Sequence, residues 1–257
     1  MTTQTPAKKY PQRVRNELRF RELTVTRVER VGAAFQRIVL SGEALAGFSS
    51  RGFDDHTKLF FPEPGSHFAP PEVTDEGIVW AEGVRPVSRD YTPLFNEQQN
   101  ELAYDFFIHD GGIASQWAMQ AKAGDKLTIG GPRGSLVVPE NYGWQLYVCD
   151  ESGMPALLRR FAALRQLAQR PQVKAIVTVA EEYYQDYLAD CGFDIDWVVG
   201  HSAQAVAEKL AAVNVPQEDY FLWLTGEGAV VKSLLDGFIT DAIDPQLVRS
   251  QAYWHKK

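Results

Sequence analysis

The sequence predicts an antiparallel β-barrel domain followed by a parallel-sheet α/β domain, with the change near residue 140. Before that position, short runs rich in β-branched and aromatic residues are separated by Gly, Pro, Asp and Asn, which is typical of a small barrel or sandwich. After it, apolar runs alternate with helical segments, which favours βαβ units on a mostly parallel sheet. With 257 residues, 45% of them hydrophobic, the chain is long enough to form two cores.

In the first half, six runs have the composition of strands. They are residues 22–28, 35–40, 58–61, 77–80, 101–109 and 126–131. A further strand is expected through SRDYTPL, residues 88–94. Because side chains alternate along a strand, Arg89 and Tyr91 are predicted on one face, and Asp90 and Thr92 on the other.

In the second half, four apolar runs are expected to be strands, each followed by a helix. The strands are residues 145–150, 174–180, 195–200 and 220–226, and the helices are residues 155–169, 181–190, 203–213 and 229–242. A parallel sheet binds ligands beyond the carboxyl ends of its strands, so the turns after residues 150, 180 and 226 are candidate sites. The last turn, GEGAVVKS, is not a phosphate-binding loop, because Val231 stands where that motif requires glycine.

Composition excludes several classes of protein. The formal net charge of −7 argues against a general nucleic-acid binder. No apolar run approaches the roughly 18 residues that a membrane span needs, and the first 20 residues have no signal-peptide core, so a soluble, cytoplasmic protein is expected. Cys149 and Cys191 are too few for a disulfide framework and are expected as buried thiols. No histidine spacing suits a metal, so no protein-bound metal is expected.

The N-terminal region carries a local excess of positive charge. Between residues 8 and 30 lie the cations Lys8, Lys9, Arg13, Arg15, Arg19, Arg21, Arg27 and Arg30, against three glutamates. Runs of charge usually face water. This segment is therefore predicted to be a solvated arm that leads into the first strand.

A glycine turn follows the strand that ends at His109. Gly111 and Gly112 form the turn, and the composition of ASQWAMQA favours a helix directly after it. Free backbone N–H groups at such a helix start could hold a phosphate.

Three motifs together indicate a family. They are R-x-Y-T at Arg89–Thr92, the glycine turn with its helix, and G-D-x-x-x-I-G-G-P-R-G at residues 124–134. The combination resembles the siderophore-interacting proteins, which are ferredoxin-reductase-like flavoenzymes. The similarity extends through residues 10–25, 50–62, 147–160 and 252–257, nearly the whole chain.

The resemblance implies an FAD-binding β-barrel at residues 1–140 and an NAD(P)H-binding α/β domain at 141–257, whose C-terminal tail returns to the flavin cleft. It also implies a flavin-dependent ferric-siderophore reductase that transfers electrons from NADPH through FAD to Fe(III). Two alternatives remain. One is a reductase that passes electrons to another acceptor, such as a small redox protein, free flavin or a quinone. The other is a carrier of siderophore or cofactor without turnover.

By the same resemblance, Tyr91 stacks on the flavin, Thr92 hydrogen-bonds near its N5, and Arg89 contacts the FAD phosphate. These two residues, Tyr91 and Thr92, are the expected catalytic pair. The further residues expected to bind FAD are Asp90, His109, Gly111, Gly112, Ala114, Ser115 and Trp117. For His109, the alternative is a strand-end histidine that is hydrogen-bonded to backbone.

The resemblance places the dinucleotide in the second half. Asp150, Glu151 and Ser152, with residues 153–156, are expected to cradle it; Gly226 and Glu227 approach the nicotinamide, and Trp254 is a further cofactor residue. An NADPH enzyme of this architecture commonly places a cation after the second strand, where this chain has Glu181 and Glu182. The carboxylates either repel the 2′-phosphate or point to solvent while Arg159, Arg160 or another cation contacts it. NADPH is therefore expected, with NADH possible.

A ferric siderophore of catecholate or other anionic type is the expected substrate. The resemblance assigns it to a basic triad, which here is Lys58, Arg133 and Arg249. Each of these cations could instead be a solvated surface charge. No nucleic-acid or membrane partner is expected, and the protein is expected to be a monomer.

Overall fold

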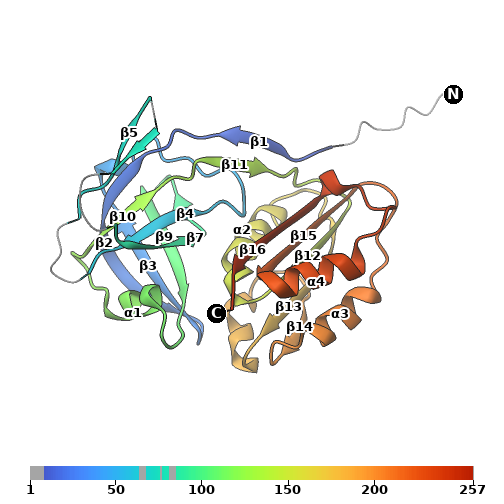
Figure 1. The fold of residues 1–257 in the computed structure, drawn as a ribbon. Coiled ribbons are helices and arrows are strands. Elements are labelled where there is room, and N and C mark those ends of the chain that lie inside the picture. Colours follow the sequence, from blue (N-terminus) through green and yellow to red (C-terminus); the bar gives the residue numbers. More distant parts are fainter. Residues whose placement is uncertain (1–8, 64–67, 76, 81–84, 257) are drawn as a thin grey trace. The chain divides into compact units, whose positions relative to one another are not determined.

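The computed structural model describes residues 9–63, 68–75, 77–80 and 85–256. It divides into two compact units (Figure 1). One unit is Arg13–Leu136, and the other is Val137–Lys257 together with the segment before Arg13. Each unit is organised around its own sheet.

The first unit is built on a curled antiparallel sheet of seven strands. In spatial order the strands are β7 (Val87–Tyr91), β4 (Thr57–Phe61), β10 (Lys126–Gly130), β2 (Phe20–Val31), β3 (Phe35–Ser41), β9 (Glu101–Phe107) and β8 (Leu94–Asn96). The two end strands, β7 and β8, are not hydrogen-bonded to each other, so the sheet is a half-barrel. The predicted antiparallel β-domain is confirmed.

Shorter elements complete this unit. They are the two-stranded sheet of β1 (Gln12–Arg15) and β11 (Gly134–Val137), the hairpin of β5 (Glu72–Thr74) and β6 (Gly77–Val79), the 3₁₀ turn η1 (Glu43–Leu45) and the helix α1 (Ile113–Gln120). Alternation along β2 buries Leu23 and Val25 while Glu22 faces solvent. Ala114 and Ala118 of α1 pack on the same core.

One member of the N-terminal charge run departs from the prediction. Arg21 is only 3% exposed, lies on the inward face of β2, and has its guanidinium carbon 5.4 Å from the centre of the Phe48 ring. Burial lowers the pKa of Arg21. The run is thus not wholly a solvated arm, because strand alternation turns every second residue of β2 inward. Lys8 lies outside the described residues.

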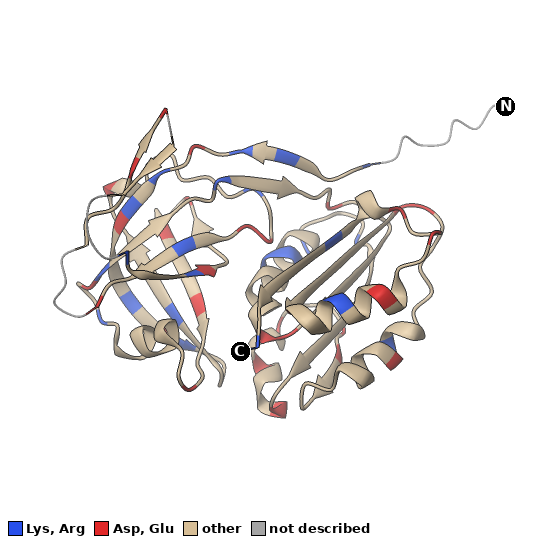
Figure 2. Ribbon diagram, viewed as in Figure 1, with Lys and Arg blue, Asp and Glu red and all other residues tan. Residues whose placement is uncertain are grey.

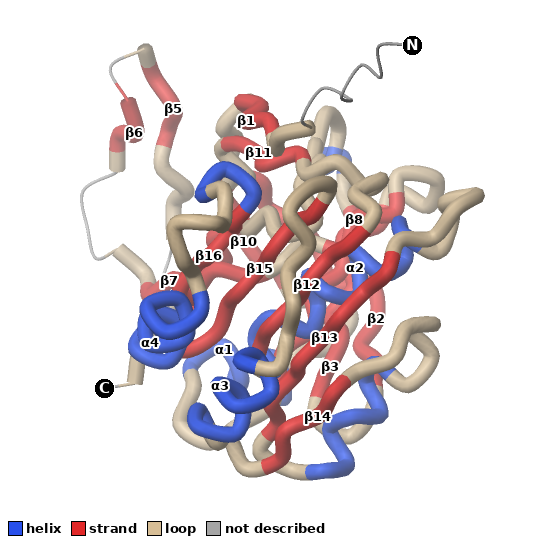
Figure 3. The backbone as a smooth tube through the Cα atoms, turned by 90° about the vertical axis from the view of Figure 1, so that its right-hand side faces the viewer, coloured by secondary structure: helices blue, strands red, loops and turns tan. Residues whose placement is uncertain are grey.

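The second unit is a five-stranded parallel sheet with the order β14 (Asp196–Val199), β13 (Gln172–Val179), β12 (Trp144–Cys149), β15 (Tyr220–Glu227) and β16 (Val248–Trp254). Helices α3 (Ala203–Ala211) and α4 (Gly228–Phe238) cover one face, and α2 (Met154–Leu164) covers the other (Figures 1 and 3). The chain runs outward from β12 to β14 and then crosses to β15 on the other side of β12. The order reverses between β12 and β15, where such sheets bind ligands.

Several segments of this unit differ from the sequence prediction. The expected helix 229–242 ends at Phe238. Residues 181–190 contain the 3₁₀ helix η3 (Glu182–Leu188) rather than an α-helix. Its three tyrosines have low helix propensity. The expected helix 155–169 ends five residues early, at Leu164. The C-terminal segment, expected as a tail, forms β16 after the 3₁₀ turn η4 (Pro245–Leu247) and pairs in parallel with β15.

Within the described ranges, no helix is long and apolar enough to cross a membrane. The same part of the chain contains no group of three or more His, Cys, Asp or Glu side chains placed to hold a metal ion. Acidic and basic segments are interspersed along the strands of the antiparallel unit (Figure 2).

Candidate functional site

The SRDYTPL segment forms β7 and the turn into β8. Register pairs Tyr91 with Thr57, Asp90 with Lys58 and Arg89 with Leu59 of β4. Cross-strand partners share a face, so Tyr91 and Arg89 lie on the face of the buried Thr57 and Leu59, and Asp90 lies on the opposite face. This agrees with the predicted alternation. Thr92 follows the end of the strand and is 7% exposed.

Tyr91 rests on the aromatic edge of the half-barrel core. Its ring centre lies 4.4 Å from that of Phe106, with the planes tilted by 40°. Burial raises the pKa of Tyr91 above its usual value, so the phenol stays neutral. Trp117 of α1 packs on the other members of the same cluster, 5.7 Å from Phe106 and 5.6 Å from Phe61. Tyr91 and Trp117, predicted from separate motifs, therefore contact one aromatic residue.

The glycine turn joins β9 to α1 through a serine. The Ser115 hydroxyl donates to the His109 carbonyl at 2.8 Å and accepts from the His109 N–H at 2.9 Å. The His109 ring contacts the Asp110 carbonyl through Nδ1 at 3.0 Å, which supports its alternative role as a strand-end histidine. A Cβ on Gly112 would lie 2.6 Å from this ring, whereas Gly111, with φ of 77°, faces open space. The turn thus requires glycine at both positions.

These residues fit a group that needs backbone donors. Gly112 is the N-cap of α1 and supplies no side-chain cap. The exposed Gly111 has nothing within 4 Å of where a Cβ would stand. A phosphate can therefore approach the backbone at Gly111 without displacing a side chain.

Two of the three predicted substrate cations lie on adjacent parts of the antiparallel unit. Lys58 of β4 pairs in register with Gly130 of β10, and Arg133 follows Gly130 by three residues. Lys58 Nζ lies 2.9 Å from Asp90 Oδ1, and about half of each side chain is exposed. The Arg133 carbonyl accepts from the Asn16 N–H at 3.1 Å, and its side chain is exposed.

A buried carboxylate, which the sequence reasoning did not identify, supports both cation-bearing segments. Asp55 Oδ2 accepts from the Ser50 hydroxyl at 2.9 Å, the Gly52 N–H at 3.0 Å and the Ser135 hydroxyl at 2.6 Å. Asp55 precedes Lys58 by three residues, and Ser135 follows Arg133 by two. The signal available in the sequence was the polar run SRGFDD directly before a strand.

In the α/β unit, Asp150 links the carboxyl ends of three strands. It follows β12, accepts the Ser152 N–H at 2.9 Å and the Glu227 N–H at the end of β15 at 3.1 Å, and accepts the Trp254 Nε1–H at the end of β16 at 2.8 Å. Burial raises the pKa of Asp150. Four predicted residues therefore meet at the switch point of the sheet.

Two glycines allow the backbone to pack closely against neighbouring side chains at the carboxyl edge of the sheet. A Cβ on Gly226, whose φ is 141°, would lie 2.8 Å from Asp150 Oδ2. A Cβ on Gly153 would lie 2.6 Å from the Cys149 Cβ and 2.7 Å from the Thr225 Cγ2. Glycine at both positions leaves a side-chain-free backbone, which suits a dinucleotide pyrophosphate at the start of α2.

Glu151 forms a second link, toward β13 and β14. Its Oε1 accepts the Ala180 N–H at 2.7 Å, and its Oε2 lies 2.7 Å from His201 Nε2. Glu151 is 3% exposed, whereas 43% of the His201 side chain is exposed. The hydrogen bond to Glu151 raises the pKa of His201. The sequence reasoning weighed His201 only as a metal ligand; its position directly after the third strand run was the signal for a site residue.

Glu227 holds the start of α4. Its carboxylate accepts the N–H groups of Ala229 at 2.8 Å and Val230 at 3.0 Å, and also that of Lys256 at 3.2 Å. These backbone bonds, with that to Val230 foremost, lower the pKa of Glu227. On β16, Arg249 Nη2 donates to Gln251 Oε1 at 2.7 Å.

Arg160 is not available to a 2′-phosphate. It is 2% exposed and donates to the Tyr147 hydroxyl at 2.8 Å, the Gln145 side chain at 2.9 Å, and the carbonyls of Val138 and Pro139 at 3.0 and 2.6 Å. Its guanidinium holds the chain entering β12 against α2. The expectation that Arg160 could contact the phosphate is wrong, because the inward face of α2 carries it into the core.

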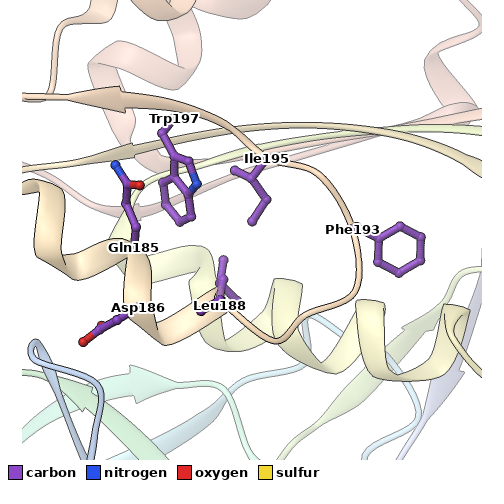
Figure 4. Close-up of a pocket in the computed structure, with 7 residues that line it drawn as sticks. Gln185, Asp186, Leu188, Phe193, Ile195 and Trp197 are labelled. Atoms are coloured by element: carbon purple, nitrogen blue, oxygen red, sulfur yellow. The ribbon is translucent and has the colours of Figure 1, made fainter.

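A cavity of about 260 Å³ lies beside η3 (Figure 4). It is lined by Gln185, Asp186, Leu188, Ala189, Phe193, Ile195 and Trp197. Most of these residues come from η3 and the segment leading into β14, which is the amino-terminal side of that strand. The cavity is therefore separate from the strand ends that carry Asp150, Glu151 and Gly226.

Two family models match the sequence, and two relatives are similar to it along most of its length. Residues 24–136 match the model of the siderophore-interacting FAD-binding domain, and residues 142–257 match that of siderophore-interacting proteins. The chain is 66% identical over 250 residues to the NADPH-dependent ferric-chelate reductase of Escherichia coli, covering 97% of this chain and 98% of that protein. It is 33% identical to the ferric vibriobactin reductase of Vibrio cholerae, covering 82% and 80%.

Solved structures show the same fold. A siderophore utilization protein from T. fusca superposes with a TM-score of 0.82 at 28% identity, over 96% of each chain. A siderophore-interacting protein from Aeromonas hydrophila superposes with a TM-score of 0.72 at 22% identity, over 93% of this chain and 99% of that one.

Proposed function

This chain belongs to the siderophore-interacting protein family, and from that premise we propose that it is a flavin-dependent ferric-siderophore reductase that uses NADPH and FAD. The observation that carries the proposal is the identity of 66% over 97% of the chain with a relative named as an NADPH-dependent ferric-chelate reductase. Each of the two units binds one of the two cofactors. The half-barrel binds FAD, and the α/β unit binds the nicotinamide dinucleotide.

In the half-barrel, Tyr91 provides the wall for the isoalloxazine. Its ring is supported from behind by Phe106, at 4.4 Å, and its phenol is neutral, so it presents an aromatic face without charge. Arg89 shares that face of β7 and offers a cation to the FAD phosphate. Thr92 has a hydroxyl close to the same strand end, suited to a hydrogen bond near flavin N5. When bound, FAD supplies the exchange between a two-electron hydride donor and a one-electron acceptor.

The remaining FAD residues act through the turn before α1. Gly111 leaves the backbone open to the pyrophosphate, Gly112 leaves room for the His109 ring, and Ser115 fixes the turn through its two hydrogen bonds to His109. Ala114 packs beneath the turn in the core. In this proposal Trp117 reaches the adenine side while the rest of its ring remains on Phe61 and Phe106.

In the α/β unit, the carboxyl edge of the sheet positions the dinucleotide. Gly153 and the start of α2 accept its pyrophosphate, and Gly226 and Glu227 approach the nicotinamide. Asp150 holds Glu227 and Trp254 in place through the hydrogen bonds that it accepts from them. These residues orient the donor and exclude water from it.

The substrate is proposed to be an anionic ferric chelate, of which a ferric catecholate is the type expected. Fe(III) is bound by hard oxygen donors. Fe(II) has a lower charge and binds these donors less tightly, so reduction releases the iron. The protein need not ligate iron; it needs cations that attract the complex. Lys58, Arg133 and Arg249 are the proposed cations.

The decisive test measures both half-reactions by anaerobic stopped-flow absorbance near ~450 nm, where oxidised flavin absorbs. NADPH should bleach the purified, FAD-loaded protein, and a ferric catecholate should restore the colour within the turnover time. Rapid reoxidation by a small redox protein, free flavin or a quinone, with none by ferric chelates, would favour the alternative acceptor. Absence of any bound flavin would favour a carrier.

A monomer in the cytoplasm is part of the proposal. Reduction by NADPH requires access to the intracellular nucleotide pool, which the cytoplasm provides. Sedimentation velocity should give a single species near the chain mass of 28.8 kDa. A dimer would contradict this part without affecting the reaction.

A further inference from the structure

The carboxyl ends of β13 and β14 present an electrostatic problem for NADPH. A dinucleotide fold that accepts a 2′-phosphate needs a cation close to the adenosine ribose. Directly after β13, however, this chain has the exposed carboxylates of Glu181 and Glu182. Arg160 is buried in the core and contributes no charge to that edge.

His201 is an ionisable side chain at the carboxyl end of β14. It follows β14 by two residues and is the neighbour of Ser202, the N-cap of α3. Its Nε2 lies 2.7 Å from Glu151 Oε2, and Glu151 Oε1 also accepts the N–H of Ala180, at the end of β13. The imidazole is thereby tied to the strand ends of β12 and β13, although it belongs to β14.

The contact with Glu151 distinguishes the two nitrogens of the imidazole ring. Because Glu151 already accepts from Ala180, its carboxylate serves as the acceptor for the proton on Nε2. Protonation then places the second proton on Nδ1, the nitrogen on the other side of the ring. With 43% of the side chain exposed, a ligand at the strand ends can reach the ring.

The charges around His201 favour the protonated ring. The carboxylates that act on it are Glu151, in contact, and Asp150. On η3, Tyr184 lies close enough to Glu151 and to Glu181 to interact electrostatically with each, and Tyr184 is neutral because burial raises its pKa to about 12. The amino end of α3 opposes protonation of the ring but attracts a phosphate. The hydrogen bond that His201 donates to Glu151 prevails and raises the pKa of His201.

We infer that His201, oriented by Glu151, donates from Nδ1 to the 2′-phosphate of NADPH and is the residue that selects NADPH over NADH. This inference rests on the proposed use of a nicotinamide dinucleotide by the α/β unit. Glu181 and Glu182 then lie to one side, and the phosphate is held by a cation on the next strand of the sheet rather than by one after β13.

The first experiment measures binding without turnover. Calorimetry compares 2′,5′-ADP, which carries the 2′-phosphate, with 5′-AMP, which lacks it, on the purified full-length protein. The variants are His201→Asn, which removes the charge and tolerates the φ of 53° at this position, and His201→Arg, which keeps the charge. Lys209→Gln is the matched control, because it removes a cation from the last turn of the same helix α3.

His201→Asn should weaken 2′,5′-ADP about ten-fold, the effect of one charge-assisted hydrogen bond, and leave 5′-AMP unchanged. His201→Arg and Lys209→Gln should bind both ligands as the parent does. Raising the pH from about 6.5 to about 9 should remove the parent's preference for 2′,5′-ADP and not that of His201→Arg, because arginine stays charged. In NMR titrations, 2′,5′-ADP should raise the pKa of the His201 ring, assigned by its absence in His201→Asn.

Equal binding of the two ligands by the parent, or an unchanged preference in His201→Asn, would overturn the inference. A correctly folded variant is established beforehand by circular dichroism and the urea midpoint. Flavin reduction by NADPH and NADH separates the two proposals. If neither nucleotide reduces the flavin but His201→Asn still loses 2′,5′-ADP selectivity, the reductase proposal fails and the site at His201 stands. If both nucleotides reduce it equally, the inference fails and the reductase stands.

Discussion

The Trp254 indole donates from Nε1 to the Asp150 carboxylate at 2.8 Å, although 104 residues separate them. The same carboxylate accepts the N–H groups of Ser152 and Glu227. One buried side chain therefore connects the turn after β12 to the carboxyl ends of β15 and β16. Burial raises the pKa of Asp150 and so disfavours its ionised form. The hydrogen bonds that it accepts stabilise the ionised form.

Replacing Asp150 by Ala should lower the free energy of unfolding by about 2 kcal/mol, because it leaves several buried donors without an acceptor. Trp254→Phe, which removes a single donor, should cost about 1 kcal/mol. The double variant should be less destabilised than the sum of the two, by about 1 kcal/mol, as expected for residues in contact. Urea unfolding measures all three. Strict additivity would show that the Asp150–Trp254 bond does not contribute.

Gly153→Ala should destabilise the protein by about 1 to 3 kcal/mol, because the new Cβ meets the Cys149 Cβ at 2.6 Å and the Thr225 Cγ2 at 2.7 Å. Gly237→Ala is the matched control. Gly237 lies in α4 with nothing within 4 Å of its added Cβ, so alanine should stabilise by about 0.5 to 1 kcal/mol. Unfolding midpoints that shift in the same direction for both variants would refute the close approach at Gly153.

Tyr91→Ala should weaken FAD binding about ten-fold, because it removes the ring that rests on Phe106 and that we propose as the wall for the flavin. Tyr91→Phe keeps the ring and should bind within about two-fold of the parent. Flavin release, followed by fluorescence, gives both affinities. If Tyr91→Phe loses as much as Tyr91→Ala, the hydroxyl and not the aromatic face makes the contact.

Lys58→Ala and Asp90→Asn should have opposite effects on an anionic ferric catecholate. The Lys58–Asp90 pair spans 2.9 Å and is half exposed, so neither change should cost more than about 1 kcal/mol of stability. Loss of the cation should raise the apparent KM about ten-fold, whereas loss of the carboxylate should lower it. Arg133→Ala and Arg249→Ala should resemble Lys58→Ala.

A neutral hydroxamate complex is the control substrate for these four variants, and its kinetics should not change. Added salt should imitate the loss of a cation, because charges are screened over about 8 Å at physiological ionic strength. Flavin reduction by NADPH should stay constant in Lys58→Ala, Arg133→Ala and Arg249→Ala. Parent-like kinetics of all three cation variants on the catecholate would show that these side chains are only solvated charges.

The Glu151–His201 pair should make stability depend on pH. Glu151 raises the pKa of His201 in the folded state above the ordinary value of 6.5, so the folded protein binds the proton more tightly than the unfolded chain. The stabilisation is fully present below about pH 6.5 and is lost as the pH rises through the raised pKa. Urea unfolding of the parent and His201→Asn should therefore differ more at about pH 6 than at about pH 9. A constant difference would contradict the pairing.

Local patterns in the sequence were sufficient for most of the elements. Alternation in SRDYTPL predicted which side chains of β7 share a face, because the side-chain period of a strand is set by the backbone alone. The change in sequence pattern near residue 140 predicted two kinds of sheet. The chain passes from one unit to the other between residues 136 and 137. The turns after residues 150 and 226 were predicted as candidate sites because parallel sheets bind ligands at the carboxyl ends of their strands.

Which side chains meet was decided only by the tertiary structure. Arg159 and Arg160 are neighbours in sequence, yet only the latter is turned into the core by α2, where it bonds to the chain entering β12. His201 and Glu151 are 50 residues apart and touch because β14, β13 and β12 are consecutive in the sheet. Sequence periodicity fixes the direction of a side chain relative to its own strand or helix. Its partners depend on strand order and on the packing of helices over the sheet, which are set by burial of the whole core and cannot be read from any local segment.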